Sequence, residues 1–249
     1  MLISENLALV ASLQFGIGSG YDCHVYAVRQ ASGITLVDSG SGLAPDRLLA
    51  ELDSHWPGAK LEAIILTHSH ADHACGAQPL RARTGCAVYS PDVCLEAIRI
   101  GDEYYNGLAE ARALGMYTAQ TRLLPCPDAV GYSDGSAFQV GVREYRPIHV
   151  RGHSDDSHCL VTEVDGRRTL FAGDVIFFGA MLGVIDRHDS GMDGYREDLA
   201  KLAELDIDAL LPGHGIFTVR DGQSHIDKAL DLLGRGLPIR QIGQSPLIF

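Results

Sequence analysis

The stretch "LEAIILTHSHADH", residues 61–73, joins an apolar run to a dense group of polar side chains. Three histidines and one aspartate, namely His68, His70, Asp72 and His73, fall within six consecutive positions. A polar turn after a strand explains one such residue. Four imidazole and carboxylate donors this close favour a metal site instead, because these groups suit zinc and neighbouring transition metals. We therefore predict a strand that runs into a metal-binding loop.

The composition is that of an ordinary globular protein with an excess of negative charge. Hydrophobic residues make up 46% of the 249 residues and charged residues 21%, and the net charge is −12. Because phosphate binding needs clustered Lys and Arg, the excess of 32 acidic over 20 basic residues argues against nucleic acid as a partner. We expect a small-molecule substrate, and leave open whether the chain forms a homodimer.

The cysteines and the N-terminal sequence bear on localisation. The six cysteines form no C-x-x-C pair, which is typical of reduced thiols in a cytoplasm; they are Cys23, Cys75, Cys86, Cys94, Cys126 and Cys159. The apolar opening lacks a basic leading segment and carries Glu5, so we expect no signal peptide. No run reaches the roughly 20 apolar residues that cross a bilayer. A cytoplasmic protein without a membrane partner is predicted.

Short strands and helices alternate along the chain. Runs typical of strands end in Gly, Asp or Ser and lie at 7–15, 24–30, 34–40, 61–67, 86–90, 137–150, 157–166, 167–174 and 207–215. Helices are expected over 44–56, from Asp72 to 84 with a disturbance at Pro79, and over 195–206. Strands in both halves with helices between them predict two β-sheets covered by helices, in a single domain spanning 1–249.

Residues 92–130 differ from their surroundings. They are rich in Ala, Leu and Glu, which predicts one or two helices inserted between strand runs. The segment also carries Tyr104, Tyr105, Met116 and Tyr117, side chains that could form an apolar lid with a few hydroxyl groups. The alternative is a helical layer that packs on the rest of the domain.

Three later segments repeat the order of a strand, a glycine and a metal-binding side chain. They are "VRGHSDDSH" with His153, "LFAGDV" with Asp174 and "LLPGHG" with His214. Glycine lets the backbone turn tightly and approach closely, which helps where several loops converge on one ion. We interpret the four segments as one metal-binding constellation.

In this order, His-x-His-x-Asp-His, Gly-His, Gly-Asp and Gly-His closely resemble the motifs of the metallo-β-lactamase superfamily of hydrolases, from "VDSG" at 37–40 to "PGHG" at 212–215. The resemblance implies an α+β fold, a four-layer αββα sandwich with the site along one edge. It also implies two metal ions. The implied ligands are His68, His70 and His153 for the first ion and Asp72, His73 and His214 for the second, with Asp174 bridging both.

This ligand set leaves a coordination position open, which is typical of a catalytic metal site. A water held there, or between two ions roughly 3.5 to 4 Å apart, loses a proton near neutral pH and becomes the nucleophile. We therefore predict a binuclear hydrolase of the glyoxalase II-like or lactonase-like branch, in which a metal-bound hydroxide cleaves a carbonyl ester, lactone or thioester. Zinc is the expected metal, with iron or manganese as alternatives, and Asp72 and Asp174 are the ligands assigned to catalysis.

Two residues are expected to support the ligands. Asp38 of "VDSG" matches a position that braces the metal-bearing loop in the family, so we assign it to support of the ligands. His24 stands where relatives often carry Asn, and we interpret it as a hydrogen-bonded residue of the pocket, with metal ligation as the alternative.

The residues after the bridging position bear on substrate choice. Phe177, Phe178 and Met181 predict an apolar wall opposite Tyr104 and Tyr105, which favours an uncharged acyl group over a highly charged substrate. Here the sequence departs from two branches that it resembles. Glyoxalase II-like enzymes carry a basic residue where Gly183 and Val184 stand, and lactonases often carry Tyr in the stretch of Phe177 and Phe178.

Other activities on the same fold are the alternatives. A persulfide dioxygenase holds one iron by two His and an Asp, which would leave His73 and His214 without a role. RNA-processing nucleases and phosphodiesterases use the same ligands, but the acidic balance counts against nucleic acid. True β-lactamases usually lack an Asp at the bridging position, so Asp174 counts against antibiotic hydrolysis.

Overall fold

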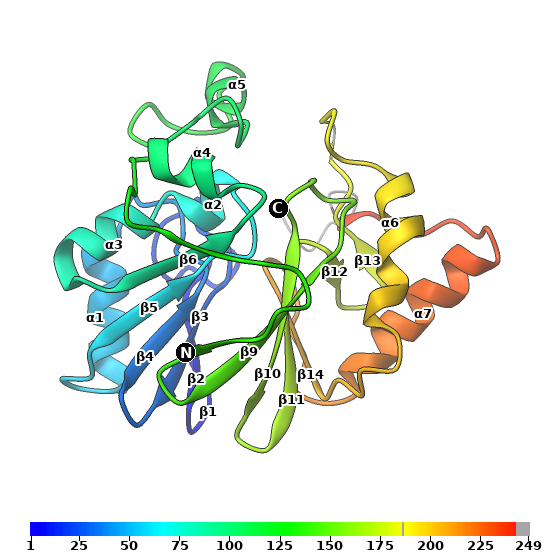
Figure 1. The fold of residues 1–249 in the computed structure, drawn as a ribbon, viewed down its shortest axis with the longest axis horizontal. Coiled ribbons are helices and arrows are strands. Elements are labelled where there is room, and N and C mark those ends of the chain that lie inside the picture. Colours follow the sequence, from blue (N-terminus) through cyan, green and yellow to red (C-terminus); the bar gives the residue numbers. More distant parts are fainter. Residues whose placement is uncertain (186, 243–249) are drawn as a thin grey trace. The chain divides into compact units, whose positions relative to one another are not determined.

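The computed structural model describes residues 1–185 and 187–242, which group into two compact units. Unit 1 comprises residues 1–132 and 139–143, and unit 2 comprises residues 133–138 and those from 144 onward. Each unit has its own sheet (Figure 1). Each also has its own apolar core. The interpretation of 1–249 as a single domain stays a prediction.

Unit 1 is built on a seven-stranded sheet whose strands follow one another in chain order. The first four strands pair antiparallel, with short turns between the first and the second and between the third and the fourth. The pairs from the fourth strand to the seventh are parallel, because helical crossovers join them (Figure 1). The strands are β1 (Leu2–Ser4), β2 (Leu7–Ala11), β3 (Val25–Gln30), β4 (Gly33–Val37), β5 (Leu61–Ile65), β6 (Ala87–Pro91) and β7 (Val130–Tyr132).

Helices cover this sheet with their apolar sides. Helix α1 (Pro45–His55) carries Pro45 in its first turn, where the missing N–H removes no hydrogen bond, and it buries Leu48 and Leu52 in the core. The helix expected from Asp72 to 84 is two helices, α2 (Ala71–Ala74) and α3 (Ala77–Thr84). The disturbance predicted at Pro79 was therefore misplaced, because Pro79 lies in the tolerant first turn of α3.

The break between these helices lies at Gly76. A Cβ atom at this position would lie 1.9 Å from the carbonyl oxygen of Ser39, and the Gly76 N–H donates to the Gly40 carbonyl at 2.9 Å. Only glycine allows so close an approach of two backbones. The segment that follows the histidine motif is thus locked against the loop that follows β4.

Residues 92–130 contain the predicted helices in a short form, α4 (Leu95–Ile100) and α5 (Leu108–Ala113). Side-chain bonds organise much of the rest. The Arg112 guanidinium pairs with the Glu103 carboxylate and donates to the Thr121 carbonyl at 2.9 Å, while Glu103 also accepts from the Leu123 N–H at 3.3 Å. A partly buried ion pair thus helps to hold the irregular parts of the segment around α5.

Most of a five-stranded sheet in the order β14-β11-β10-β9-β8 lies in unit 2, together with a small hairpin of β12 and β13. Strand β10 pairs antiparallel with β9 and β11, and β11 pairs parallel with β14. The strands are β8 (Phe138–Val140), β9 (Arg143–His149), β10 (His158–Val164), β11 (Arg167–Gly173), β12 (Ile176–Phe177), β13 (Met181–Leu182) and β14 (Ala209–Pro212).

The helix expected over 195–206 is α6 (Met192–Asp198), continued by a 3₁₀ turn, η1 (Leu199–Leu202). Tyr195, Leu199 and Leu202, which recur at three- to four-residue spacing, are fully buried. A further helix, α7 (Gly222–Gly234; Figure 1), was not predicted. It packs Ile226 and Ala229 into the same core. Within the described residues, no helix is long and apolar enough to cross a membrane.

A pair of stacked histidines joins the strands on either side of the loop 150–157. His149 ends β9 and His158 begins β10; they are register partners, and their rings stack at 4.5 Å with an interplanar angle of 9°. His149 Nε2 lies 2.7 Å from the Asp155 carbonyl oxygen and His158 Nδ1 lies 2.9 Å from that of Asp156. Since carbonyl oxygens only accept, both nitrogens carry protons, and both rings fasten the loop.

His158 makes the stability of the fold depend on pH. Burial lowers the pKa of His158 from 6.5 to about 4, so the unfolded chain binds more protons between these two values. The resulting stabilisation is complete above pH 6.5 and is lost as the pH falls towards 4; its size is about 3 kcal/mol. We expect His158→Asn, which keeps a donor near the Asp156 carbonyl but does not titrate, to show a shallower fall in unfolding free energy over this range. Denaturant titrations measure it, and equal slopes in both proteins would contradict the assignment.

Candidate metal centre

The donors of unit 1 follow the carboxyl ends of two neighbouring parallel strands. Val37 of β4 is the register partner of Ile65 of β5, so Asp38 and Thr67 emerge at the same edge of the sheet. Asp38 adopts a left-handed conformation with φ 63°, which Asp tolerates better than most residues. Its carboxylate accepts from the Thr67 N–H at 2.8 Å and lies 2.8 Å from His73 Nδ1.

This contact determines which nitrogen of His73 is available to a metal. An ionised carboxylate only accepts, so His73 Nδ1 carries the proton and Nε2 is the acceptor. His73 Nε2 lies 3.5 Å from Asp72 Oδ2. In the same loop, His68 Nε2 and His70 Nδ1 face each other at 3.1 Å.

These separations fit shared metal ions. With metal–nitrogen bonds of about 2.0–2.1 Å, two ligands of a tetrahedral ion lie roughly 3.3 Å apart. The His68/His70 pair and the Asp72/His73 pair both have that spacing. The structure thus brings together the four predicted donors of the histidine motif as two adjacent pairs.

The donors of unit 2 meet at one edge of its sheet for a similar reason. Gly173 of β11 is the parallel partner of Pro212 of β14, so Asp174 and His214, which follow these strands, emerge side by side. His153 lies in the loop that leads into β10, the antiparallel neighbour of β11. Asp174 Oδ2 lies 3.6 Å from His153 Nε2 and 3.4 Å from His214 Nε2.

Asp174 is therefore placed as a shared carboxylate within its unit. Its side chain is almost completely buried, and two imidazole nitrogens point at the same oxygen. A buried carboxylate is costly unless it is hydrogen-bonded or neutralised by a cation. The arrangement suits one oxygen that contacts two cations, one beside each histidine.

Backbone and phenol contacts orient these donors. His153 Nδ1 donates to the Gly183 carbonyl at 2.5 Å, which leaves Nε2 directed at Asp174. A Cβ at Gly183 would lie 2.0 Å from the Asp174 carbonyl oxygen, so the position requires glycine. The buried Tyr195 hydroxyl accepts from the Gly183 N–H at 3.0 Å and donates to the Asp174 carbonyl at 3.5 Å.

Sequence reasoning missed the contribution of Gly183 and Tyr195. Gly183 was interpreted only as the absence of a basic residue, and Tyr195 had no role beyond its place in the helix expected over 195–206. No local sequence signal shows that its hydroxyl reaches the backbone of two residues near the metal-binding donors.

Cys23 also joins the network of unit 1. Its thiol, one Asp38 oxygen and one ring nitrogen of His73 lie within 4.8 Å of one another, and all three residues are buried. Asp38 already accepts from Thr67 and His73, so these atoms form a hydrogen-bonded support for His73. Burial raises the pKa of the Cys23 thiol well above its usual range, which keeps the thiol protonated.

His24 is completely buried among aromatic rings. The centroid of its ring lies 5.6 Å from that of Phe15 and 6.0 Å from that of Tyr26. Its surroundings therefore suit a packed residue next to Cys23 better than a residue that contacts substrate. Its assignment as a pocket residue stays a prediction.

The residues expected to select substrate differ in exposure. Tyr104 is 87% exposed, and the Tyr105 hydroxyl donates to the Val93 carbonyl at 3.3 Å. In unit 2, Phe178 is partly exposed and lies against His225, with ring centroids 4.4 Å apart.

Phe177 requires a correction. This ring is 0% exposed and packs with Ile242 and the partly buried Met181. A fully buried ring cannot contact a substrate, because its neighbours already fill the space around it. The hairpin of β12 and β13 buries Phe177 on one face and turns Phe178, the next residue, outward. Phe177 is a core residue and is not a candidate wall of the pocket.

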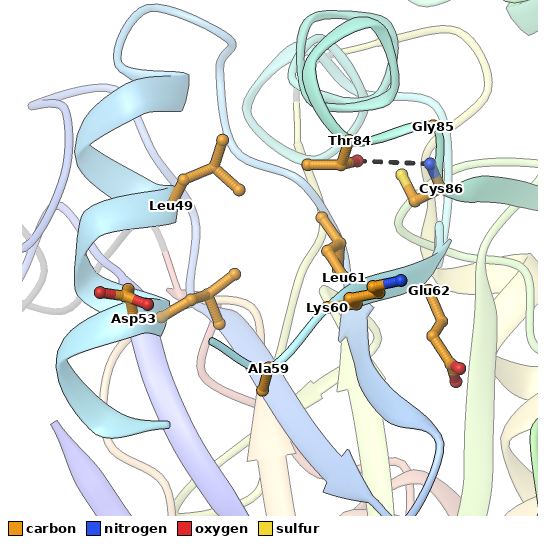
Figure 2. Close-up of a pocket in the computed structure, with 10 residues that line it drawn as sticks. Leu49, Asp53, Ala59, Lys60, Leu61, Glu62, Thr84, Gly85 and Cys86 are labelled. Atoms are coloured by element: carbon orange, nitrogen blue, oxygen red, sulfur yellow. Dashed lines mark hydrogen bonds between the residues drawn. The ribbon is translucent and has the colours of Figure 1, made fainter. Parts of the chain in front are cut away.

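A cavity of about 650 Å³ lies elsewhere in unit 1. Figure 2 shows it between α1, the start of β5 and the segment Thr84–Cys86, with Leu49, Leu61 and Cys86 among its lining residues. The metal-binding donors follow the end of β5, whereas this cavity adjoins its beginning. None of the predicted ligands lines it, so it is separate from the candidate metal centre.

Comparison with known proteins agrees with this fold. The family model of the Metallo-beta-lactamase superfamily matches residues 18–214, and the chain belongs to that superfamily. Among solved structures, a Cronobacter sakazakii metallo-β-lactamase with a HARLDQ motif has a TM-score of 0.70 at 16% identity and covers 95% of this chain and 93% of its own. A β-lactamase from Chitinophaga pinensis has a TM-score of 0.67 at 16% identity and covers 94% and 91%. The predicted α+β fold of the metallo-β-lactamase type is confirmed.

The matches to sequence relatives cover a smaller share of each protein. A hydroxyacylglutathione hydrolase of Francisella tularensis is 27% identical over 175 residues, which span 70% of this chain but only 55% of the relative. An uncharacterized protein of Aquifex aeolicus is 27% identical over 161 residues, 64% of this chain and 67% of its own. The chain thus matches about half the length of the named hydrolase.

The role of Asp38 can be tested by replacing its carboxylate. The Asp38 carboxylate faces the Thr67 N–H with one oxygen and His73 Nδ1 with the other. In Asp38→Asn only one oxygen remains, so the amide NH₂ must face one of these two partners. If it faces His73, the ring must move its proton to Nε2, which can then no longer bind a metal. We expect metal affinity to fall about 10- to 100-fold with the fold retained, measured by competition with a chelator. Asp46→Asn, at an exposed carboxylate that pairs with Arg83, is the matched control and should match the parent.

Proposed function

We propose that the protein is a binuclear metal-dependent hydrolase that cleaves a carbonyl ester, lactone or thioester of a small molecule. The observation that carries the proposal is the position of Asp174 Oδ2, within 3.6 Å of His153 Nε2 and 3.4 Å of His214 Nε2. One oxygen between two imidazoles is suited to contact two cations at once. Membership of the superfamily and the relationship to a hydroxyacylglutathione hydrolase support hydrolysis of an acyl substrate.

The proposed ligands are those that the resemblance to the superfamily implies. The first ion is assigned to His68, His70 and His153, and the second to Asp72, His73 and His214, with Asp174 shared. When bound, divalent ions lower the pKa of a coordinated water towards neutrality and polarise a carbonyl oxygen. Asp72 and Asp174 are the carboxylates proposed to act next to the reacting atoms.

Neighbouring residues fix the tautomers of two of the proposed histidine ligands. Asp38 keeps the proton of His73 on Nδ1, and the Gly183 carbonyl does the same for His153. The ring nitrogens left for metal ions are therefore chosen before any ion binds, which reduces the rearrangement needed for binding. Zinc is the proposed metal, because it suits mixed imidazole and carboxylate donors, and iron and manganese are the alternatives.

The binuclear proposal predicts metal content directly. Elemental analysis of protein purified without chelators, then supplied with excess zinc, should approach two ions per chain. Asp174→Asn replaces the shared carboxylate with a poorer neutral ligand, so we expect it to lose at least one ion and to lower turnover of a thioester or lactone substrate by 100-fold or more. A folded parent that never exceeds one ion would sink the binuclear proposal, and normal metal content and turnover in the variant would refute the role of Asp174.

Substrate selection is proposed for exposed side chains that bind no metal. The ligands activate water alike for many acyl groups, so selection must come from neighbouring surfaces. Tyr104, Tyr105 and Phe178 are the proposed residues. We expect Ala substitutions at these positions to change relative kcat/KM among lactones, thioesters and simple esters without a change in metal content. Ile100→Ala, an exposed apolar residue at the end of α4, is a control for general surface effects. An unchanged ranking of substrates would refute the assignment.

A further inference from the structure

The segment 92–130 reaches the histidine motif at two points within unit 1. The Tyr117 hydroxyl donates to Asp72 Oδ1 at 3.1 Å, and the Asn106 side-chain amide donates to the Ser69 carbonyl at 3.2 Å. Ser69 lies between His68 and His70, and Asp72 precedes His73. The inserted segment therefore contacts the motif at Ser69 and at Asp72, and Asp72 is a proposed metal ligand.

The Tyr117 contact gives the two carboxylate oxygens of Asp72 different partners. Oδ1 accepts from the phenol, while Oδ2 lies 3.5 Å from His73 Nε2, the nitrogen left free of a proton by Asp38. A carboxylate held in this way presents Oδ2 to an ion beside His73. Without the phenol it could rotate about χ2 and exchange its oxygens or bind through both.

Tyr117 is well suited to this contact. Its ring packs against the core of unit 1 and lies 5.8 Å from the ring of Tyr21, so the phenol is held from both sides. The packed ring places the hydroxyl as a donor to Asp72 Oδ1.

Asn106 anchors the same segment by a second route. The residue is 3% exposed, and its side-chain oxygen accepts from the Leu108 N–H at 3.0 Å, at the start of α5. Its amide thus connects the beginning of a helix to the backbone of the motif. The two contacts lie eleven residues apart in the chain, at positions 106 and 117, on either side of α5.

We propose that residues 102–121 act as a positioning element for the second metal ion, in which the Tyr117 hydroxyl fixes the orientation of Asp72. The inference rests on the proposed function, since it takes Asp72 as a ligand. It assigns to the segment a role in metal binding that is separate from any contact with substrate. Tyr117 acts through Asp72 and is a positioning residue.

The contact also links metal binding to the order of the segment. A ligand that binds better when Asp72 is held by Tyr117 must, by thermodynamic reciprocity, strengthen the hold of Tyr117 on Asp72. Occupancy of the second site should therefore protect residues 102–121 from hydrogen exchange. A segment that only packed on the surface, or only contacted substrate, would not respond to metal alone.

Tyr117→Phe tests the proposal, because it removes one hydroxyl and keeps the packed ring. We expect the second zinc ion to bind about 10- to 100-fold more weakly and the first ion to bind as in the parent, measured by competition with a chelator. Cobalt(II) added in place of zinc should give an altered visible absorption spectrum only for the second equivalent. Tyr105→Phe is the matched control, since that hydroxyl bonds to the Val93 carbonyl in the same segment and should leave both affinities unchanged.

Hydrogen exchange of the parent protein gives a measurement that needs no variant. Exchange in peptides covering 102–121 should slow on addition of the second zinc equivalent, and this protection should be reduced in Tyr117→Phe. Equal affinities in parent and variant, an equal loss of both ions, or no protection by metal would each overturn the inference while the binuclear proposal stands. A folded parent that binds no metal would instead refute the proposed function on which the inference rests.

Discussion

The hydrogen bond between Asp38 and His73 is the contact on which the candidate metal centre of unit 1 depends. Parallel pairing of β4 and β5 places Asp38 beside Thr67, and the carboxylate then bonds both to the backbone that begins the histidine motif and to the ring that ends it. Because the carboxylate can only accept, the tautomer of His73 is determined without any ion. One buried side chain thereby sets the position of a loop and the chemistry of a ring.

Unit 2 reaches a similar result by a different path. The parallel pair of β11 and β14 brings Asp174 and His214 to one edge of the sheet. The Gly183 carbonyl fixes the tautomer of His153, as Asp38 fixes that of His73 in unit 1. In both units, the donors follow strands whose carboxyl ends share an edge, where polar groups can converge without interrupting the sheet. The apolar strands supply rigidity, and the loops supply the ligands.

Close backbone contacts make these loops rigid. Gly76 and Gly183 lie where a Cβ atom would meet a carbonyl oxygen at 1.9 and 2.0 Å. Each allows a loop that carries a donor to rest directly on another loop, so that hydrogen bonds replace side-chain packing. Phenols complete the support, with Tyr195 holding the backbone of Gly183 and Asp174 and Tyr117 holding the carboxylate of Asp72.

The sequence by itself determined the fold class and the proposed ligands, because both correspond to short patterns of neighbouring residues. Apolar runs of strand length predicted β4, β5, β11 and β14, and each donor stands within a few residues of a strand end, where its neighbours in sequence identify it. The support of these donors was decided only by the tertiary structure. Tyr117, Tyr195 and Cys23 are distant in sequence from the atoms they contact, and nothing in their own surroundings predicts a partner. The same reason explains Phe177 and Phe178, adjacent and chemically identical, of which the packing of the hairpin buries one and exposes the other.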